Sequence, residues 1–200
     1  MIKAIIFDLG RVIVPFDFAR GYSRISALTG LPQSEIPERI RPTGLVERLE
    51  SGTIEPRDFF RQLSEVLGLK CSYREFCEIW SSIFLPATLI SEEMLAKIAA
   101  RYRLVLLSNT NAIHFDMIRA NYPHLRHFHA LVLSHEAGAM KPSPRIYEQA
   151  VTAAGCRPEE CFFTDDVAEY VEGARRCGID AVQFESVEQI ERELRRRKVL

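Results

Sequence analysis

Five short apolar runs, each followed by residues with helical spacing, limit most strongly how this chain can fold. The runs are Lys3–Phe7, Arg103–Leu107, Ala130–Leu133, Cys161–Thr164 and Ala181–Phe184. Because they are apolar on both faces of an extended strand, they suit a parallel sheet that helices cover on each side. The alternation of strands and helices predicts an α/β fold with a doubly wound, Rossmann-like parallel sheet.

The segment from residue 16 to residue 87 interrupts this alternation. It contains no convincing strand, but apolar residues recur at helical spacing within 59–67 and again within 76–83. We therefore expect residues 1–15 and 88–200 to form the α/β core domain, and residues 16–87 to form a small helical cap domain. Ligands of such sheets bind beyond the carboxyl ends of the strands, so a cap inserted after the first strand would cover that edge.

Local signals mark several helix boundaries. Ser72 and Glu75 form a capping box in front of the second apolar stripe of the cap. Pro144 suits the first position of a helix that Ser143 would cap. Val167 is expected to belong to the apolar side of the helix that follows the fourth strand.

Composition argues against several classes of function. The 26 basic and 27 acidic residues leave a net charge of −1, so the chain lacks the overall positive field that favours nucleic-acid binding. No apolar run approaches the roughly 20 residues of a membrane span, and we expect no export signal. Five cysteines without a CxxC pair are expected to be free thiols in a reducing cytoplasm. The prediction is a cytoplasmic monomer or homodimer with no nucleic-acid or membrane partner.

Polar residues follow four of the predicted strands directly or within a few positions. Singly, each of these residue types is typical of a turn or a helix cap. Together they would gather at one edge of one parallel sheet, where they predict a ligand site. The residues are Asp8, Ser108, Asn109, Lys141, Asp165 and Asp166.

The three carboxylates of this set point to a cation. Asp8, Asp165 and Asp166 would repel one another unless positive charge lies between them. Hard oxygen donors without histidine favour Mg²⁺. Lys141 and the Ser108 hydroxyl beside that ion would suit a phosphoryl group, and one aspartate could act as a covalent nucleophile.

At these positions the chain resembles the haloacid dehalogenase-like (HAD) hydrolase superfamily over nearly its whole length. The segments 7–14 (FDLGRVIV), 106–110 (LLSNT), 141–142 (KP) and 163–166 (FTDD) look like the four motifs of that superfamily. The helical insertion looks like its small cap. The chain is most similar to bacterial sugar-phosphate phosphatases of the α-D-glucose-1-phosphate phosphatase type, and more distantly to the phosphatase domain of soluble epoxide hydrolases.

The resemblance implies a nucleophile and a metal site. Asp8 would attack phosphorus and form an aspartyl-phosphate. Asp8, the Gly10 carbonyl and Asp166 would bind Mg²⁺, and Asp165 would complete the metal site by orienting its water.

The resemblance also implies a phosphate site and a substrate class. Ser108 and the Asn109 backbone N–H would hold phosphoryl oxygens, and Lys141 would neutralise charge on the phosphate and on Asp8. Asp8, Lys141 and Ser108 are thus the expected catalytic residues. The partner implied is a small phosphorylated metabolite.

Two positions depart from the family pattern. The usual second aspartate, a general acid and base worth about 10²–10⁴-fold in rate, is replaced by Gly10. Either the leaving group needs little protonation, or another residue such as Asp17 supplies the proton, or the chain is not a phosphatase. Tyr170 stands where an Asp or Asn often supports the metal, which puts the metal affinity in question.

Two alternatives to a phosphatase stay open on sequence. A 2-haloacid dehalogenase-type hydrolase also uses a carboxylate nucleophile without the second aspartate. It usually has an aromatic residue where Gly10 stands, which favours the phosphatase. A catalytically silent phosphate-binding module would also explain Gly10 and Tyr170.

Other residues are less informative. His124, His127 and His129 form an HxxHxH pattern that we interpret as surface histidines rather than a zinc site. Some further residues could line the cleft, although a structural role is at least as plausible for each. They are Phe16, Phe18, Arg41, Glu47, Arg48, Glu50, Trp80, Asn111 and His114.

Overall fold

The computed structural model describes residues 1–200 and contains one five-stranded parallel sheet. The strands are β1 (Ala4–Phe7), β2 (Arg103–Ser108), β3 (Ala130–Leu133), β4 (Cys161–Asp165) and β5 (Asp180–Gln183). Their order across the sheet is β3-β2-β1-β4-β5, and every neighbouring pair is parallel. The predicted doubly wound α/β fold and its five strands are confirmed.

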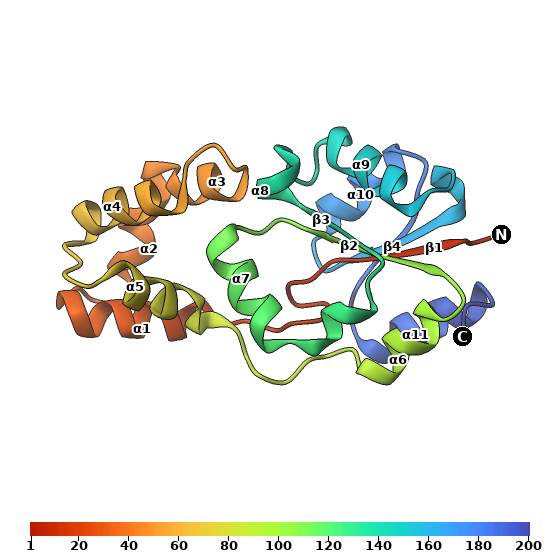
Figure 1. Ribbon diagram of the computed structural model, residues 1–200, viewed down its shortest axis with the longest axis horizontal. Helices are drawn as coiled ribbons and strands as arrows, with labels where there is room; N and C mark the ends of the chain where they lie inside the picture. Colours follow the sequence, from red (N-terminus) through yellow and green to blue (C-terminus); the bar gives the residue numbers. More distant parts are fainter.

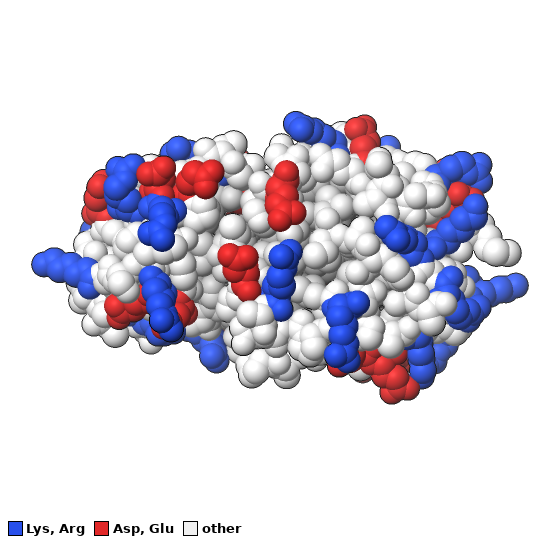
Figure 2. Space-filling model, in the orientation of Figure 1, with Lys and Arg blue, Asp and Glu red and all other residues white.

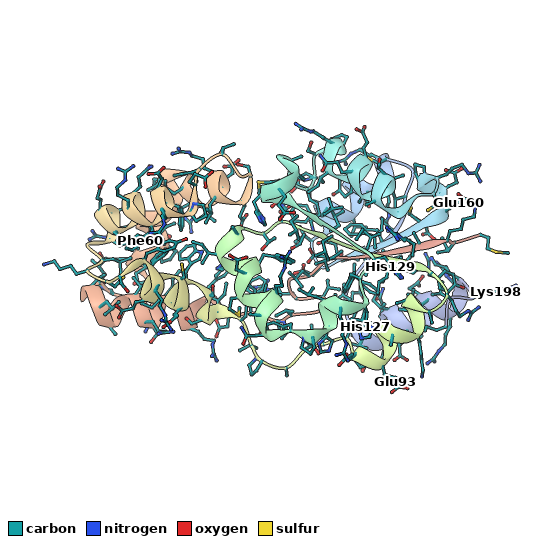
Figure 3. The ribbon with its side chains drawn as sticks, in the orientation of Figure 1. Phe60, Glu93, His127, His129, Glu160 and Lys198 are labelled. Atoms are coloured by element: carbon teal, nitrogen blue, oxygen red, sulfur yellow. The ribbon has the colours of Figure 1, made fainter.

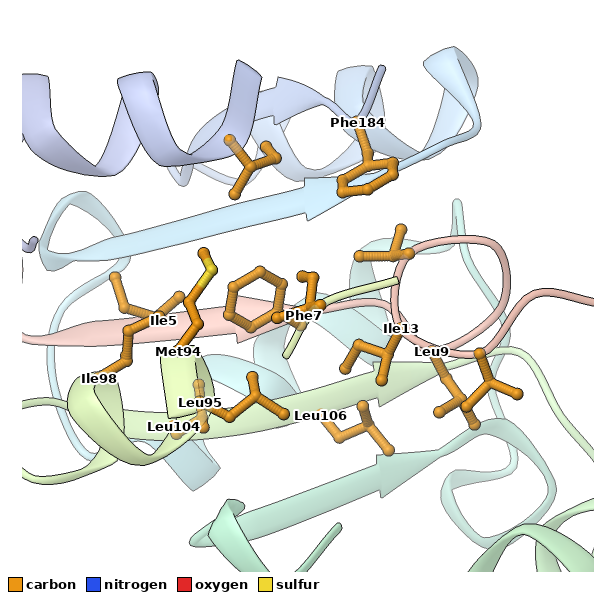
Figure 4. Close-up of a cluster of buried hydrophobic side chains, with 14 of the residues drawn as sticks. Ile5, Phe7, Leu9, Ile13, Met94, Leu95, Ile98, Leu104, Leu106 and Phe184 are labelled. Atoms are coloured by element: carbon orange, nitrogen blue, oxygen red, sulfur yellow. The ribbon is translucent and has the colours of Figure 1, made fainter. Parts of the chain in front are cut away.

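Helices cover both faces of the sheet (Figure 1). Alternate residues of β1 point to opposite faces, so Ile5 and Phe7 pack into one hydrophobic cluster and Ala4 and Ile6 into another. The first cluster is completed by α6 (Glu92–Ala99), α7 (Ala112–Asn121) and α11 (Val187–Arg196), and Figure 4 shows its centre. The second is completed by α9 (Pro144–Ala154) and α10 (Ala168–Arg176).

The chain between β1 and β2 is helical. Its main helices are α1 (Phe18–Thr29), α2 (Glu35–Ile40), α3 (Leu45–Glu50), α4 (Pro56–Leu67) and α5 (Tyr73–Trp80), with short 3₁₀ turns η1 (Arg41–Thr43) and η2 (Ser81–Ile83). Figure 1 places α1–α5 to one side of the sheet, beyond α7. These helices share a hydrophobic cluster of their own, to which α7 contributes Ile113.

Several local predictions can be compared with the structure. The Ser72 hydroxyl accepts from the Glu75 N–H at 3.2 Å and begins α5 as expected. α9 begins at Pro144, but the Ser143 side chain makes no capping hydrogen bond. The prediction for Val167 is wrong, because this residue is the N-cap of α10 and is 37% exposed.

The remaining short elements connect the strands. They are η3 (Pro123–His127), α8 (Ser134–Ala137) and η4 (Pro158–Glu160). The loop between α8 and α9 returns to the sheet edge and carries Lys141.

Strand register gathers the carboxyl ends of the strands. Phe7 of β1 pairs with Leu106 of β2 on one side and with Thr164 of β4 on the other. The Asp8 N–H continues this ladder by donating to the Thr164 carbonyl at 3.0 Å. Residues that follow these three strands therefore meet at one edge of the sheet.

The three histidines of the HxxHxH pattern have separate partners, and Figure 3 labels two of them. His124 Nε2 lies 2.9 Å from the Thr88 hydroxyl, and His127 Nε2 lies 3.0 Å from a Glu92 carboxylate oxygen. His129 Nδ1 accepts from the Leu104 N–H at 3.0 Å. These contacts assign the histidines to packing between elements.

The surface carries both signs of charge. On the face that Figure 2 shows, basic and acidic side chains are interspersed, and several form pairs three or four residues apart on one helix. No helix is both long enough and apolar enough to cross a bilayer. All five cysteines are free, and the Sγ atoms of Cys156 and Cys161 lie 3.5 Å apart.

Candidate active site

A buried lysine lies between two carboxylates at the carboxyl edge of the sheet. Asp8 directly follows β1, Asp165 ends β4, and Lys141 comes from the loop before α9. The Lys141 Nζ donates to Asp8 Oδ1 at 2.6 Å, to Asp165 Oδ2 at 2.5 Å and to the Leu107 carbonyl at 3.2 Å. None of the three charged side chains is more than 8% exposed. In such a setting an unpaired charge would cost several kcal/mol, about 3–5 by precedent.

Burial and mutual contact set the protonation of this trio. Burial, the largest influence, raises the pKa of Asp8. Lys141 opposes that rise and Asp165 adds to it. Burial alone would lower the pKa of Lys141, but the carboxylates of Asp8 and Asp165 outweigh it and raise the pKa. Lys141 is therefore held as a cation, whereas a negative charge on Asp8 depends on positive charge close by.

Asp166 completes a group of three carboxylates. One oxygen from each of Asp8, Asp165 and Asp166 lies within 4.8 Å of the others. Burial and then the charge of Asp165 raise the pKa of Asp166, while Arg11 opposes the rise. The single ammonium of Lys141 cannot neutralise three carboxylates, so a divalent cation with a preference for hard oxygen ligands fits this donor set.

Two residues at the carboxyl end of β2, Ser108 and Asn109, also belong to the site. The Asn109 side chain holds the backbone of Lys141 in both directions: Oδ1 accepts from the Lys141 N–H at 2.8 Å, and Nδ2 donates to the Lys141 carbonyl at 3.0 Å. Ser108 is buried, and its hydroxyl makes no hydrogen bond to another protein group. Ser108 and Asn109 both line a cavity of about 90 Å³.

Gly10 borders the same cavity from the loop after β1. That loop is tight: the Arg11 N–H donates to the Val14 carbonyl at 2.9 Å, and Arg11 has a positive φ of 57°. A Cβ built on Gly10 would lie 2.9 Å from the Phe16 ring and 4.0 Å from Asp8 Oδ2. The Phe16 ring therefore occupies space into which a side chain at position 10 would extend.

Tyr170 packs against the site from α10. Its hydroxyl accepts from Asn109 Nδ2 at 3.4 Å, and its ring centroid lies 5.2 Å from the Lys141 Nζ. The Tyr147 hydroxyl donates to the Tyr170 carbonyl at 2.7 Å. Tyr170 thus contacts the residues that hold the lysine, and contributes a cation–π contact to its charge.

A second cavity of about 160 Å³ lies among the helices between β1 and β2. Its lining is mostly apolar and includes Tyr22, Val46 and Trp80. It shares four lining residues with the first cavity. They are Phe18, Glu50, Ile83 and His114. The two cavities therefore adjoin one another, which fits the expectation that Phe18 and His114 face the cleft.

The hypothesis that Asp17 supplies a proton is wrong. Its side chain caps α1, where Oδ1 accepts from the Ala19 N–H at 2.9 Å, and it is exposed on an outer face beside Arg20 and Arg24. The structure instead brings Glu50 to the site. Glu50 is one helical turn after Val46 on α3, and both side chains border the apolar cavity.

Comparison with known proteins identifies the family. Residues 2–178 match the haloacid dehalogenase-like hydrolases. The chain belongs to this family of hydrolases. The match spans most of the chain and includes strands β1–β4 and the helical segment between β1 and β2.

Relatives of this hydrolase include named phosphatases. The chain is 27% identical over 193 residues to a D-ribitol-5-phosphate phosphatase of Bacteroides thetaiotaomicron, covering 93% of each chain. It is similar to the structure of a HAD family enzyme from the same organism in complex with magnesium and inorganic phosphate, with a TM-score of 0.85, 27% identity, and coverage of 94% and 96%. An L-2-haloacid dehalogenase of Xanthobacter autotrophicus shares the fold, at 19% identity with a TM-score of 0.65 over 100% of this chain and 85% of that one.

His114 of the hydrolase is held as a neutral ring. Its Nδ1 lies 3.1 Å from Asn111 Nδ2, and its Nε2 lies 3.1 Å from the Trp80 carbonyl oxygen. Because the amide nitrogen donates and the carbonyl accepts, the proton is on Nε2. Burial lowers the pKa of His114 from 6.5 to about 4.

This lowered pKa predicts a loss of stability in acid. The unfolded chain binds a proton at His114 below about pH 6.5, whereas the folded chain does so only below about pH 4. The contribution of the neutral ring to the free energy of unfolding is therefore fully present above pH 6.5 and is lost as the pH falls from 6.5 to 4. We expect the free energy of unfolding to fall by about 2 kcal/mol more for wild type than for His114→Gln between pH 7.5 and pH 5. Urea unfolding at the two pH values measures this difference, and equal losses would contradict it.

Proposed function

We propose that this hydrolase is a Mg²⁺-dependent phosphatase that acts on a small phosphomonoester, with a sugar phosphate as its substrate. One observation carries the proposal: the Lys141 ammonium pairs with Asp8 at a sheet edge where Ser108 and Asn109 line a cavity. A nucleophilic carboxylate, a fixed cation and hydrogen-bond donors at one edge of a sheet are what phosphoryl transfer requires, because its transition state spreads charge over several oxygens.

Asp8 is the nucleophile in this mechanism. One of its carboxylate oxygens forms a bond to phosphorus while the bond from phosphorus to the leaving oxygen breaks. The product is an aspartyl-phosphate, which water then hydrolyses to inorganic phosphate and free Asp8. Ser108 and the Asn109 N–H bind phosphoryl oxygens, and Lys141 neutralises charge on them and on Asp8.

The metal site is part of the proposal. Asp8, Asp166 and the Gly10 carbonyl would hold Mg²⁺, with Asp165 completing the site. The bound ion supplies positive charge toward the phosphoryl oxygens and the clustered carboxylates. The cluster within 4.8 Å and the magnesium complex of a HAD family relative support this assignment.

The substrate class rests on the relatives and on the second cavity. We propose residues 16–87 as a cap that encloses the leaving group, and residues 1–15 and 88–200 as the core that holds the phosphate. The relative named for D-ribitol 5-phosphate supports a polyol or sugar phosphate. A largely apolar cavity with a few polar groups, here Glu50 and Tyr22, is a typical ligand pocket.

A phosphatase screen tests the proposed function. With Mg²⁺, the purified protein is expected to release phosphate from sugar phosphates and from an aryl phosphate, and EDTA is expected to abolish the release until Mg²⁺ is added in excess. The measurement is phosphate release across a metabolite panel, with 2-chloropropionate as a parallel substrate.

Other outcomes would replace the proposal. Metal-independent chloride release would indicate a dehalogenase. Phosphate binding with no turnover of any panel member would indicate a silent phosphate-binding module.

A further inference from the structure

The proposed phosphatase function leaves one chemical requirement without a residue, and the inference that follows rests on that function. An alcohol leaving group needs a proton as its bond to phosphorus breaks, because an alkoxide is a poor leaving group. A positioned general acid contributes about 10²–10⁴-fold to such steps. Gly10 has no side chain to offer, and the exposed Asp17 carboxylate caps α1 and lines neither cavity.

The residues that line the first cavity, beside Ser108 and Asn109, leave few candidates for this acid. Among its lining residues, Glu50 and His114 are the two with a titratable side chain. His114 already uses both ring nitrogens, one toward Asn111 and one toward the Trp80 carbonyl, and its pKa is lowered to about 4 by burial. A neutral ring with its only N–H engaged cannot deliver a proton to a ligand.

Glu50, unlike His114, has a side chain that is not engaged by other protein groups. It is the last residue of α3 and lines both cavities, so its carboxyl lies where the phosphate end and the leaving-group end of a substrate would join. The side chain is partly buried and forms neither a hydrogen bond nor an ion pair with any protein group. A carboxyl group that lines a cavity without a protein partner is free to bond a ligand.

We propose that Glu50 protonates the leaving oxygen, in place of the aspartate that Gly10 lacks. In this step the Glu50 carboxyl transfers its proton to the leaving oxygen, and the electrons of the broken bond remain on that oxygen. The products are the alcohol, the aspartyl-phosphate on Asp8 and the Glu50 carboxylate. When water attacks the aspartyl-phosphate, the carboxylate accepts the proton that water loses, and Glu50 returns to its acid form.

The surroundings of Glu50 suit this role. Burial raises the pKa of Glu50 to about 7, the charge of Glu47 on the same helix adds to the rise, and no cation offsets it. His114 lines both cavities, Tyr22 lines the second one, and neither side chain brings charge at neutral pH. A substantial fraction of Glu50 therefore carries its proton near neutral pH, as a general acid requires.

Leaving-group dependence tests the proposal with two aryl phosphates whose leaving oxygens differ in basicity. Phenyl phosphate has a basic leaving oxygen that needs a proton, whereas 2,4-dinitrophenyl phosphate has a leaving oxygen that departs without one. Glu50→Gln is expected to lower kcat/KM for phenyl phosphate by about 10²-fold or more and to change it little for 2,4-dinitrophenyl phosphate. Glu50→Asp is expected to retain part of the activity on phenyl phosphate. The control is Glu65→Gln, which changes an exposed glutamate on α4 that lines neither cavity and should change neither rate.

The outcomes separate the acid from a structural role and from the phosphatase function itself. An equal loss on both substrates, or no loss on either, would overturn the assignment of Glu50. Thermal melting checks that the variants fold. Glu50→Leu, which places an apolar side chain beside an apolar cavity, should give the same selective pattern if the glutamine variant is unstable. If wild type hydrolyses neither substrate with Mg²⁺ but binds phosphate, the proposed function fails, and with it the role of Glu50.

Discussion

Replacing Asp8 with asparagine is expected to lower turnover of every phosphomonoester by at least about 10³-fold, because an amide cannot replace a carboxylate as the attacking nucleophile. The Asp8 side chain is 8% exposed and its Oδ1 accepts from the Lys141 ammonium at 2.6 Å. Asparagine keeps the shape and a hydrogen-bond acceptor for Lys141, so the fold should persist. The measurement is kcat with an aryl phosphate in Mg²⁺, together with a melting curve.

A matched substitution separates this effect from a general loss of acidic charge. Asp17→Asn changes an exposed aspartate nine residues further along, outside both cavities, and should leave kcat unchanged. Trapping of phosphate on Asp8 during turnover would support the nucleophile directly. An Asp8→Asn protein with more than a tenth of wild-type activity would show that another group attacks phosphorus.

Lys141→Met is expected to cause the largest loss of stability of any single change at the site. Removing the ammonium leaves the carboxylates of Asp8 and Asp165 buried and facing each other without compensation, which typically costs about 3–5 kcal/mol. Activity should also be lost, since no fixed cation would remain to offset charge on the phosphate. Urea unfolding without divalent ions measures the stability change.

The double variant Lys141→Met with Asp8→Asn provides the control. Because the asparagine removes one of the two uncompensated charges, the double variant should be more stable than Lys141→Met alone, a coupling that a double-mutant cycle quantifies. Mg²⁺ should also restore stability to Lys141→Met more than to wild type, since the ion supplies the missing positive charge. If Lys141→Met and the double variant unfold at the same urea concentration, the Asp8 carboxylate is not stabilised by Lys141 in the folded protein.

The sheet and its carboxyl edge were predictable because the alternation of apolar runs and helical segments implies how the strands pair. Five apolar runs separated by helices imply parallel strands, and the carboxyl ends of parallel strands meet at one edge. That rule places Asp8, Ser108 and Asp165 together on the basis of the sequence alone. Lys141 was harder to place, because it lies in a loop several residues beyond β3, and its resemblance to a family motif strengthened the assignment.

The surroundings of the site were less predictable. Asp17 was one candidate for the proton donor on sequence, but its exposed side chain caps α1. Glu50 looked like an ordinary surface residue of a short charged helix, yet it borders both cavities. The difference depends on how α3 packs against α4 and α8, which no local spacing rule determines.

The amino-acid sequence alone determined the alternation of strands and helices, and with it the side of the sheet where three aspartates, a serine and a lysine would gather. It could do so because periodicity and parallel pairing are local, repetitive rules. Only the tertiary structure decided that Asn109 holds the Lys141 backbone, that His114 is locked as a neutral ring and that Glu50 faces the cavity. Those contacts join residues 30 or more positions apart, and their geometry depends on the packing of whole helices against one another.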